Sequence, residues 1–307
     1  MKRTLSSLIF PLTATHAYED GYGRRRSPLS GCGARVLIAV VIAGFALFQY
    51  LSLPSERNAF TGRTQKLKLD AKQEIVLGLN SAPQMARQFG GDSRDAQAKA
   101  LVQRVGAKLV NDTDADMTPY GSNFRFHLLA DRNVVNAFAL PGGQIFITEA
   151  LFRLLKTEDE LAGVLGHEIG HVVGRHSSEQ IAKSEFIGGL TTAVVVGASG
   201  DGGSMDTARI AQMVGQVVNM KYGRNDELEA DRLAVKFLLQ SGYQPEAMIQ
   251  VMEVLRKASG GGSQPEFMST HPNPGNRIEV IKEEIAKLRA SGEDKRGGTG
   301  KPPKLEE

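Results

Sequence analysis

Two short segments, far apart in the sequence, constrain how this chain can fold. Residues 167–171 read His-Glu-Ile-Gly-His, and residues 227–231 read Glu-Leu-Glu-Ala-Asp. On a helix, residues four apart lie one turn above each other, so His167 and His171 can close on one tetrahedral zinc ion. Glu168 then faces the position left open for water and can take the proton of that water. The fold must bring a third ligand from elsewhere, and the acidic segment is the candidate.

The local sequence places the first segment on a helix. Thr157, with Glu160 three residues later, forms a capping box before an apolar run, which predicts a helix from there through both histidines. A bare match of this kind also arises in amphipathic helices that bind no metal. Four glycines fall on one stripe beside the histidines, at positions 163, 166, 170 and 174. The stripe indicates either the close approach of the element that carries the third ligand, or plain helix packing.

The acidic segment is predicted to be helical as well. Asn225 is a good N-cap and Gly242 a good C-terminal stop for a helix over residues 226–241. Such a helix turns Glu227 and Asp231 to one face. One of the two carboxylates could bind zinc while the other hydrogen-bonds a ligand histidine. The alternative is an acidic helix start that complements the helix dipole.

A third histidine nearly completes a different zinc pattern, that of the metzincins. In this sequence the last metzincin histidine would fall at Ser177, and His176 is one residue short. If the helix continues, His176 lies about 140° around from His171 and faces away from the metal. We therefore interpret His176 as a polar residue at the helix end. Glu229 is likewise predicted to point away from the metal.

These residues resemble the membrane-linked zinc metallopeptidases, which include the CAAX prenyl endopeptidases, the HtpX heat-shock proteases and the periplasmic β-barrel-assembly-enhancing proteases. The resemblance takes in residues 136–147 (Asn-Ala-Phe-Ala-Leu-Pro-Gly-Gly-Gln-Ile-Phe-Ile) and the sequence His271-Pro272-Asn273-Pro274 with Arg277. It is strongest to the β-barrel-assembly-enhancing type without its tetratricopeptide domain. The resemblance implies one zinc ion per chain, held by His167, His171 and Glu227. It also implies that Glu168 is the catalytic base and that Asp231 is a carboxylate behind a ligand histidine. His271 is then a histidine that can block the water site.

The role of His271 and the donor for the oxyanion stay open at this point. His271 lies between prolines, and an ordinary surface histidine is the alternative because such loops are usually exposed. Arg277 is close enough in sequence to steer it. Three side chains are candidates for steadying the oxyanion of the reaction, namely Tyr222, Arg224 and His271.

The remaining pattern predicts an α+β fold, mostly α, with a zincin-type metallopeptidase domain, a small β-sheet and one preceding transmembrane helix. Phe124, Phe126 and Leu128 alternate as in a strand, and residues 138–140 and 145–147 flank a Pro-Gly-Gly turn as a hairpin. The resemblance implies that this hairpin borders the cleft and can pair with an extended peptide, while the alternative is a hairpin that only completes the core. Further helices are expected at 94–110 and 278–289. Residues 187–198 are apolar but too short to span a bilayer, so a buried segment or a lid is expected.

The N-terminal part predicts a membrane anchor. Residues 36–53 are apolar and long enough to span a bilayer, and the basic segment 1–35 before them places the N-terminus in the cytoplasm. We expect a catalytic domain at 54–290 and a flexible tail at 291–307. The location would be a bacterial inner membrane, single-pass, with the domain in the periplasm, and a mitochondrial inner membrane is the minor alternative. Cys32 is the only cysteine, so no disulfide forms within the chain.

Charge excludes one class of function. The net charge of +3 arises largely from the first 35 residues, and no basic face with interleaved aromatics follows, so nucleic acid is not expected as a partner. The expected function is a membrane-anchored zinc endopeptidase that cuts unfolded or misassembled envelope proteins, with the envelope assembly machinery as a further candidate partner. The alternative is a peptide-binding chaperone or outer-membrane assembly factor with a mainly structural zinc. Cleavage of CAAX prenyl peptides is disfavoured because one anchor builds no membrane chamber.

Overall fold

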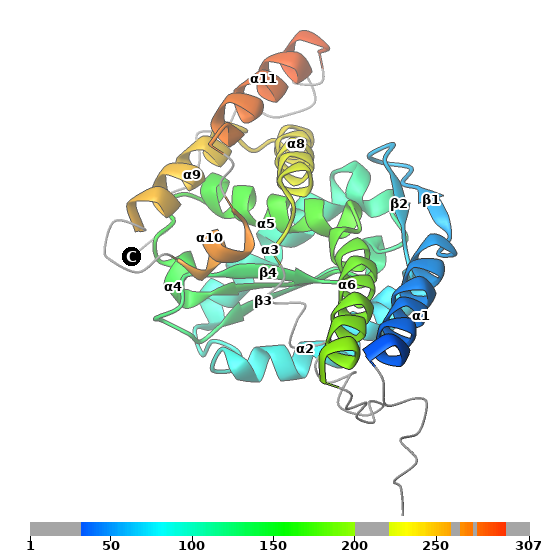
Figure 1. Cartoon of the computed structure of the whole chain (residues 1–307). Helices are drawn as coiled ribbons and strands as arrows, with labels where there is room; N and C mark the ends of the chain where they lie inside the picture. The colour runs from blue at the N-terminus through cyan, green and yellow to red at the C-terminus, as the bar shows by residue number, and fades with distance from the viewer. Residues whose placement is uncertain (1–31, 200–220, 259–264, 273–274, 293–307) are drawn as a thin grey trace, which may run out of the picture.

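The computed structural model describes residues 32–199, 221–258, 265–272 and 275–292 (Figure 1). A small central sheet and the helices around it form the body of the molecule, which confirms the expected class, mostly helical with small sheets. The helices and strands are, in order, α1 (Cys32–Leu51), β1 (Ser55–Arg57), β2 (Thr64–Lys66), α2 (Ala71–Gln88), α3 (Ala96–Asn111), the 3-10 helices η2 (Asp114–Met117) and η3 (Gly121–Asn123), β3 (Arg125–Leu129), β4 (Ala137–Leu140), β5 (Gln144–Thr148), α4 (Glu149–Phe152), α5 (Glu158–Val173), α6 (His176–Ser199), α8 (Arg224–Ser241), α9 (Ala247–Ala258), α10 (Glu266–Thr270) and α11 (Arg277–Ala290).

The central sheet has the strand order β3-β5-β4. Strand β5 pairs antiparallel with β4 and parallel with β3, so the predicted hairpin and the strand beside it are confirmed. The hairpin turn needs glycine, because Gly142 and Gly143 have φ of 80° and 104°. A β carbon on Gly142 would also lie 2.4 Å from the α carbon of Ile75, so α2 packs directly on the turn. All residues of β4 and β5 are buried.

Helix α5 carries residues 167–171 through the middle of the core. It begins where the sequence predicted, since the Thr157 hydroxyl accepts the backbone N–H of Glu160 at 3.2 Å. The Glu160 carboxylate accepts the N–H of Lys156 at 2.5 Å instead of that of Thr157, so the predicted capping box is only half formed. Every residue of α5 is buried, because the sheet and α3 cover one side while α8 and α9 cover the other.

Two of the four glycines, Gly166 and Gly170, face α8, whereas Gly163 faces Met248 of α9 and Gly174 faces His176. A β carbon on Gly166 would lie 3.6 Å from the α carbon of Ala234, and one on Gly170 would lie 2.9 Å from the carbonyl oxygen of Ala230. The backbones of the two helices therefore touch at these glycines. Since α8 is the helix that carries Glu227, close approach of the ligand-bearing element is the correct interpretation for Gly166 and Gly170, whereas Gly163 serves helix packing against α9.

Helix α8 begins two residues earlier than predicted. Its N-cap is Gly223, not Asn225, because the Asp226 carboxylate accepts the Gly223 N–H at 3.1 Å and extends the first turn. The helix ends at Gly242 with φ 80°, as the sequence predicted.

Helix α5 stops at Val173, so the assumption of a continuous helix into His176 is wrong. Arg175 takes φ 55°, an uncommon backbone conformation for a residue other than glycine, and α6 starts directly after it. The Arg175 guanidinium donates to the buried Glu74 carboxylate at 2.7 Å, and to the Leu69 carbonyl at 2.8 Å. These long-range contacts hold the turn in place.

The β1–β2 hairpin closes the same turn from the outside. The side-chain amide of Asn58 donates to the Val173 carbonyl at 2.8 Å, and that of Gln65 donates to the Gly174 carbonyl at 2.8 Å. Carbonyls at the end of a helix lack partners within the helix, so these amides supply them. The segment just after α1 therefore caps the C-terminal end of the helix that carries both histidines.

Helix α1 is, among the described residues, the one helix long and apolar enough to cross a membrane, over Gly33–Leu51. It runs beside α6 (Figure 1): the rings of Tyr50 and Phe186 stack with centroids 4.9 Å apart, and a β carbon on Gly189 would lie 2.7 Å from that of Ala46. Residues 187–198 were expected to be buried or to form a lid; burial is wrong at their start, because Ile187 is 60% exposed.

Several expectations fall outside the described part of the chain. They concern most of the basic segment 1–35, Pro274 and most of the tail 291–307.

Candidate metal site

Helix α5 brings His167 and His171 to one point. Their Nε2 atoms lie 3.0 Å apart, and the two rings meet edge to face with centroids 4.7 Å apart. Each residue is 1% exposed. The spacing of four residues thus converges two imidazole nitrogens inside the core.

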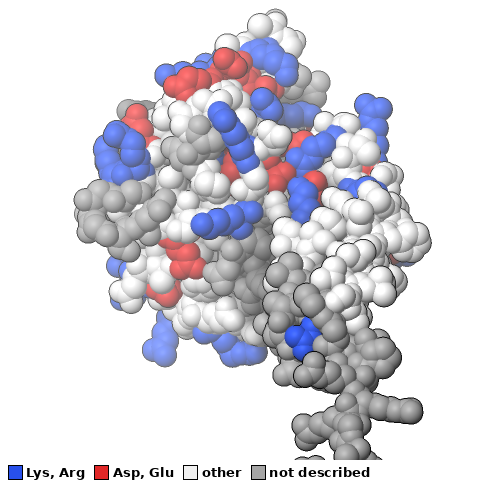
Figure 2. Space-filling model, in the orientation of Figure 1, with Lys and Arg blue, Asp and Glu red and all other residues white. Residues whose placement is uncertain are grey.

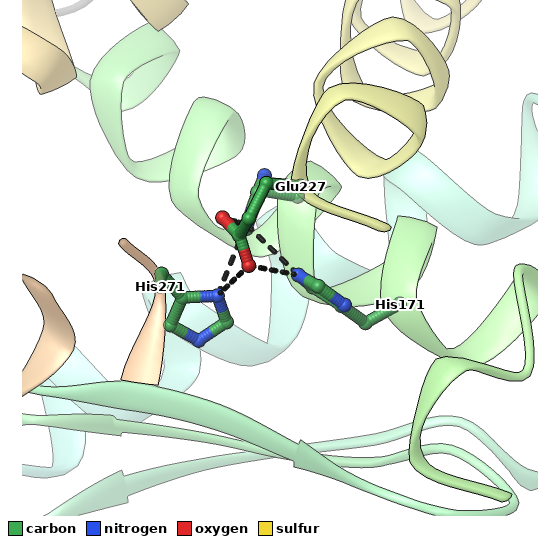
Figure 3. A group of neighbouring side chains, drawn as sticks. His171, Glu227 and His271 are labelled. Carbon is green, nitrogen blue, oxygen red and sulfur yellow. Dashed lines mark hydrogen bonds and ion pairs between the residues drawn. The ribbon is translucent and has the colours of Figure 1, made fainter. Parts of the chain in front are cut away.

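Two other segments add a donor each. Glu227, in the first turn of α8, places Oε1 3.5 Å from His171 Nε2 and Oε2 3.5 Å from His167 Nε2. His271 directly follows α10, and its Nδ1 lies 3.1 Å from Glu227 Oε1 and 3.3 Å from His167 Nε2. Figure 3 shows His171, Glu227 and His271 pointing toward one another from three separate elements. One donor atom of each of the four residues lies within 4.8 Å of all the others.

The separations of these donors fit a small tetrahedral ion. Four ligands at zinc distances of about 2.0–2.1 Å leave neighbouring donor atoms about 3.4 Å apart. The shorter separations found here run from 3.0 Å to 3.5 Å, and the whole set lies within 4.8 Å. Imidazole nitrogens with a carboxylate are also donors that zinc accepts. The arrangement can therefore hold a metal ion of this size.

The charge of the site also fits a divalent cation. Three carboxylates, Glu168, Glu227 and Asp231, are completely buried and face one buried guanidinium, that of Arg277. When the imidazoles are neutral, as metal ligands must be, this leaves two negative charges in the core. Buried charge without compensation is costly, and a divalent cation supplies the compensation.

The Glu168 carboxylate has no hydrogen-bond donor among the described residues. Neither of its carboxylate oxygens accepts a hydrogen bond from any described residue, although the side chain is 0% exposed. The Nε2 atom of His271 lies 3.6 Å from Glu168 Oε1. Burial raises the pKa of Glu168 above its usual value. A carboxyl group with a raised pKa and free acceptor atoms is suited to accept a proton.

Asp231 lies behind His167, on the side away from the other donors. Its Oδ1 is 3.0 Å from His167 Nδ1. Arg277 holds Asp231 through two hydrogen bonds, from Nε at 2.7 Å and from Nη2 at 2.6 Å, and its Nη1 lies 2.9 Å from Glu227 Oε2. Although burial opposes it, the two carboxylates raise the pKa of His167 to about 9. Arg277 thus contacts the carboxylates, and the expectation that it steers His271 is not supported by these contacts.

His176 is not one of the four metal donors, as expected, but its interpretation as a polar residue at the end of a continuous helix is wrong. His176 is fully buried, with Nδ1 2.9 Å from His171 Nδ1 and Nε2 2.7 Å from Glu229 Oε2. Glu229 does point away from the metal donors, as predicted, but it contacts the residue behind His171. The turn at Arg175 redirects the chain and brings His176 back against α5. From the sequence, the contact between His176 and His171 could have been predicted only by recognising that the helix breaks at Gly174.

The candidates for stabilising the oxyanion differ in whether they lie near the donor cluster. Tyr222 stacks on His171 with ring centroids 4.0 Å apart, and its hydroxyl is 2.9 Å from Ser177 Oγ. Arg224 is exposed and donates to the Asn276 side chain at 2.9 Å, so it is turned away from the donor cluster.

His271 is not a surface residue, which rules out that alternative. It is 1% exposed, its ring stacks on Phe267 with centroids 4.4 Å apart, and its N–H donates to the Phe267 carbonyl at 2.8 Å. The backbone N–H of Tyr222 donates to the carbonyl of Thr270 at 3.1 Å, which ties this segment to the start of α8. His271 therefore fills the fourth corner of the donor cluster from within the core.

The buried helix α5 carries two converging histidines with an acid between them, and α8 supplies a glutamate to the same point. These features define a zincin-type metallopeptidase domain. The sequence profile of peptidase family M48 matches residues 96–285. The chain belongs to this family. The match contains all four donor residues but begins after the β1–β2 hairpin.

Individual relatives agree with the family assignment. The chain is 31% identical over 223 residues to the β-barrel assembly-enhancing protease of Yersinia pestis, which covers 71% of this chain and 45% of that protein. It is 30% identical over 230 residues to the protein of the same name in Escherichia coli K12, covering 72% and 45%. The mitochondrial metalloendopeptidase OMA1 of Saccharomyces cerevisiae is 25% identical over 304 residues, covering 90% and 85%. The chain thus spans less than half the length of the two bacterial relatives.

Proposed function

We propose that this protein is a membrane-anchored zinc-dependent endopeptidase that hydrolyses peptide bonds of unfolded or misassembled envelope proteins. The observation that carries the proposal is Glu168, a buried carboxylate whose two oxygens accept no hydrogen bond from the described residues and which lies beside a converging set of zinc-type donors. A metal site that only stabilised the fold would not need a free buried acid next to it. The family assignment supports the same conclusion.

In the proposed mechanism His167, His171 and Glu227 hold one zinc ion. Zinc supplies a Lewis acid that polarises the scissile carbonyl and lowers the pKa of water at the site. Glu168 accepts the proton of the attacking water on a carboxylate oxygen and passes it to the leaving amine. Asp231 accepts the hydrogen of His167 Nδ1 and so keeps Nε2 directed at the other donors, a distance of 3.0 Å supporting this bond.

His271 is proposed to close the site at rest. Its Nδ1 occupies the corner that a substrate and water need, so departure of the ring would admit both. The same segment also covers the start of β4, because the Phe267 N–H donates to the Val135 carbonyl at 3.2 Å. One movement of α10 would therefore free the fourth corner and expose backbone next to the outer strand of the sheet.

The substrate class is inferred from that strand. Strand β4 is at the edge of the sheet, and an extended peptide can add to an edge through main-chain hydrogen bonds that tolerate many sequences. All four residues of β4 are buried in this conformation, so peptide binding requires the opening just described. Unfolded chains offer such extended segments. The names of the bacterial relatives, which refer to β-barrel assembly, support envelope proteins as substrates and the envelope assembly machinery as a partner.

For the location we propose a single-pass inner-membrane protein with a periplasmic catalytic domain. Helix α1 supports an anchor at residues 36–53, following the cytoplasmic segment 1–35 and preceding the catalytic domain at 54–290 and the tail at 291–307. The resemblance to a mitochondrial metalloendopeptidase keeps the mitochondrial inner membrane as the minor alternative.

One observation favours a second candidate, a peptide-binding chaperone or assembly factor with a structural zinc. Four protein donors converge here, and structural zinc sites are closed by four protein ligands. The two candidates differ in what Glu168 does.

Replacing Glu168 by glutamine separates them. We expect Glu168→Gln to keep its zinc, because Glu168 is not a ligand, and to lose hydrolysis of unfolded casein. Glu158→Gln, on the same helix but paired with Arg104, serves as the control and should cut normally. Zinc content is measured on the purified full-length chain beside the digestion. Casein cleavage by Glu168→Gln at the unmodified rate would exclude the proposed mechanism.

A further inference from the structure

We propose that His176 and Glu229 form a relay that fixes the ring orientation and the proton position of His171, and thereby sets the affinity of the site for zinc. The inference rests on the proposed function, because it takes His171 as a zinc ligand. It adds two positioning residues: His176 contacts the side of His171 that faces away from the metal donors, and Glu229 contacts His176.

The hydrogen atoms of the relay can be assigned step by step. A carboxylate only accepts, so His176 Nε2, 2.7 Å from Glu229 Oε2, carries a hydrogen. A neutral imidazole has one N–H, and His176 Nδ1 is then an acceptor. His171 Nδ1, 2.9 Å away, must donate to it. The lone pair of His171 Nε2 is left facing His167 and Glu227, where the metal ion belongs.

The relay resembles the contact between Asp231 and His167, in which a carboxylate faces the Nδ1 atom of a ligand histidine. The relay differs in having one more residue, His176, between the carboxylate and the ligand. Asp231 contacts His167 Nδ1 directly at 3.0 Å, whereas Glu229 reaches His171 through the ring of His176. Both carboxylates are backed by a guanidinium: Arg277 holds Asp231, and Arg63 Nη1 lies 3.5 Å from Glu229 Oε2. Each ligand histidine thus has its own carboxylate, one direct and one relayed.

The relay is held rigidly by the turn between α5 and α6. His176 folds back so closely that a β carbon on Gly174 would lie 2.4 Å from its Nε2. The left-handed Arg175 makes this fold-back, and the amides of Asn58 and Gln65 pair the carbonyls at the turn. A ring that is fully buried and braced from two sides needs little reorganisation when zinc binds.

The affinity for zinc is the direct readout, measured by competition with a chelator on the full-length chain in detergent. Removing a partner of a ligand histidine typically weakens metal binding by about 10–100-fold. We expect Glu229→Gln to raise the zinc Kd by about 10-fold and His176→Phe to raise it by about 10–100-fold. In the double variant the effects should not multiply, because Glu229 acts only through His176.

Matched controls and a conservative variant distinguish a relay from general damage. His127→Phe removes a histidine that contacts Gln144 far from the donors in sequence, and Glu158→Gln removes a buried acid, so both should leave the Kd within about twofold. His176→Asn keeps an oxygen near the Nδ1 position and should bind zinc more tightly than His176→Phe. The visible absorption of bound Co²⁺ should change in Glu229→Gln and not in the controls, and it reports the ligand field independently of stability.

Two results would overturn the relay: a Kd within about twofold of the unmodified chain for both Glu229→Gln and His176→Asn, or effects that multiply in the double variant. If His176→Phe does not fold, Glu229→Gln and His176→Asn decide the question. Because no peptide is present, the test is separate from that of the proposed function. A chain that shows the relay but cuts no substrate would overturn the endopeptidase alone.

Discussion

Two glycines of α5, one turn apart, provide a sensitive test of the packing that positions Glu227. A methyl group added at Gly166 would meet the α carbon of Ala234 at 3.6 Å, which is an ordinary contact. A methyl group added at Gly170 would meet the carbonyl oxygen of Ala230 at 2.9 Å and its α carbon at 3.1 Å. The obstacle at Gly170 is backbone, which cannot rotate away. Gly170→Ala must therefore push α8 outward, and Gly166→Ala need not.

The expected magnitudes follow from two opposing terms. Alanine is favoured over glycine inside a helix by about 1 kcal/mol, and both variants gain this term. Over-packing at a rigid contact costs roughly 1–3 kcal/mol, and only Gly170→Ala carries this cost. We expect Gly166→Ala to stabilise the fold by up to about 1 kcal/mol. The difference between the variants isolates the over-packing term, roughly 1–3 kcal/mol, because the helix term cancels.

Thermal unfolding of the two variants, in detergent and with a chelator present, measures this difference. For a domain of this size each kcal/mol corresponds to about 2–4 °C in Tm, so Gly166→Ala should melt about 2–12 °C above Gly170→Ala. Zinc affinity should fall only in Gly170→Ala, since moving α8 carries Glu227 away from His171. Equal melting temperatures, or a more stable Gly170→Ala, would refute the argument that α8 is held at its closest approach by this glycine.

Other expected outcomes concern the ligands, the gate and the anchor. Glu227→Ala should lower zinc occupancy far more than Glu229→Ala, because only the former removes a donor; metal analysis of both purified variants checks this, and the reverse order would contradict the assigned helix face. His271→Ala should retain zinc and change casein hydrolysis, upward if the ring only blocks the site and downward if it also steadies the oxyanion, whereas an unchanged rate would remove its role as a gate. Reporter fusions after Leu53 should be active in the periplasm, and activity confined to the cytoplasm would reverse the topology.

The parts of the site that local sequence determines were predictable. The helix through His167 and His171 follows from Thr157 and the apolar run after it, and the structure starts the helix at that cap. The glycine row indicated a close neighbour, and α8 is that neighbour. The hairpin over β4 and β5 follows from alternation around a turn that requires positive φ. Each inference used residues within one or two turns of each other.

The parts that depend on distant contacts could not be predicted in this way. His176 was placed by extending the helix, but the helix ends at Val173, whose carbonyl pairs with Asn58, 115 residues away. His271 was left open because a proline-bracketed loop is usually exposed, whereas here it packs on Phe267 inside the core. Local propensity carries no information about either partner. The N-cap of α8 was missed for a different reason, because the contact of the Asp226 carboxylate with the Gly223 N–H is local.

Residues that come before α5 in the sequence and residues that come after it both contact the carboxylates around the donor cluster. Arg277, at the first residue of α11, backs the carboxylate behind His167. Arg63, in the hairpin that follows α1, lies before the stretch that matches the family and still pairs with Asp226 at 2.7 Å. Its second neighbour there is Glu229, the acid behind His176. The segment that follows the apolar helix is therefore in contact with Glu229, the acid that we propose positions His171 through His176.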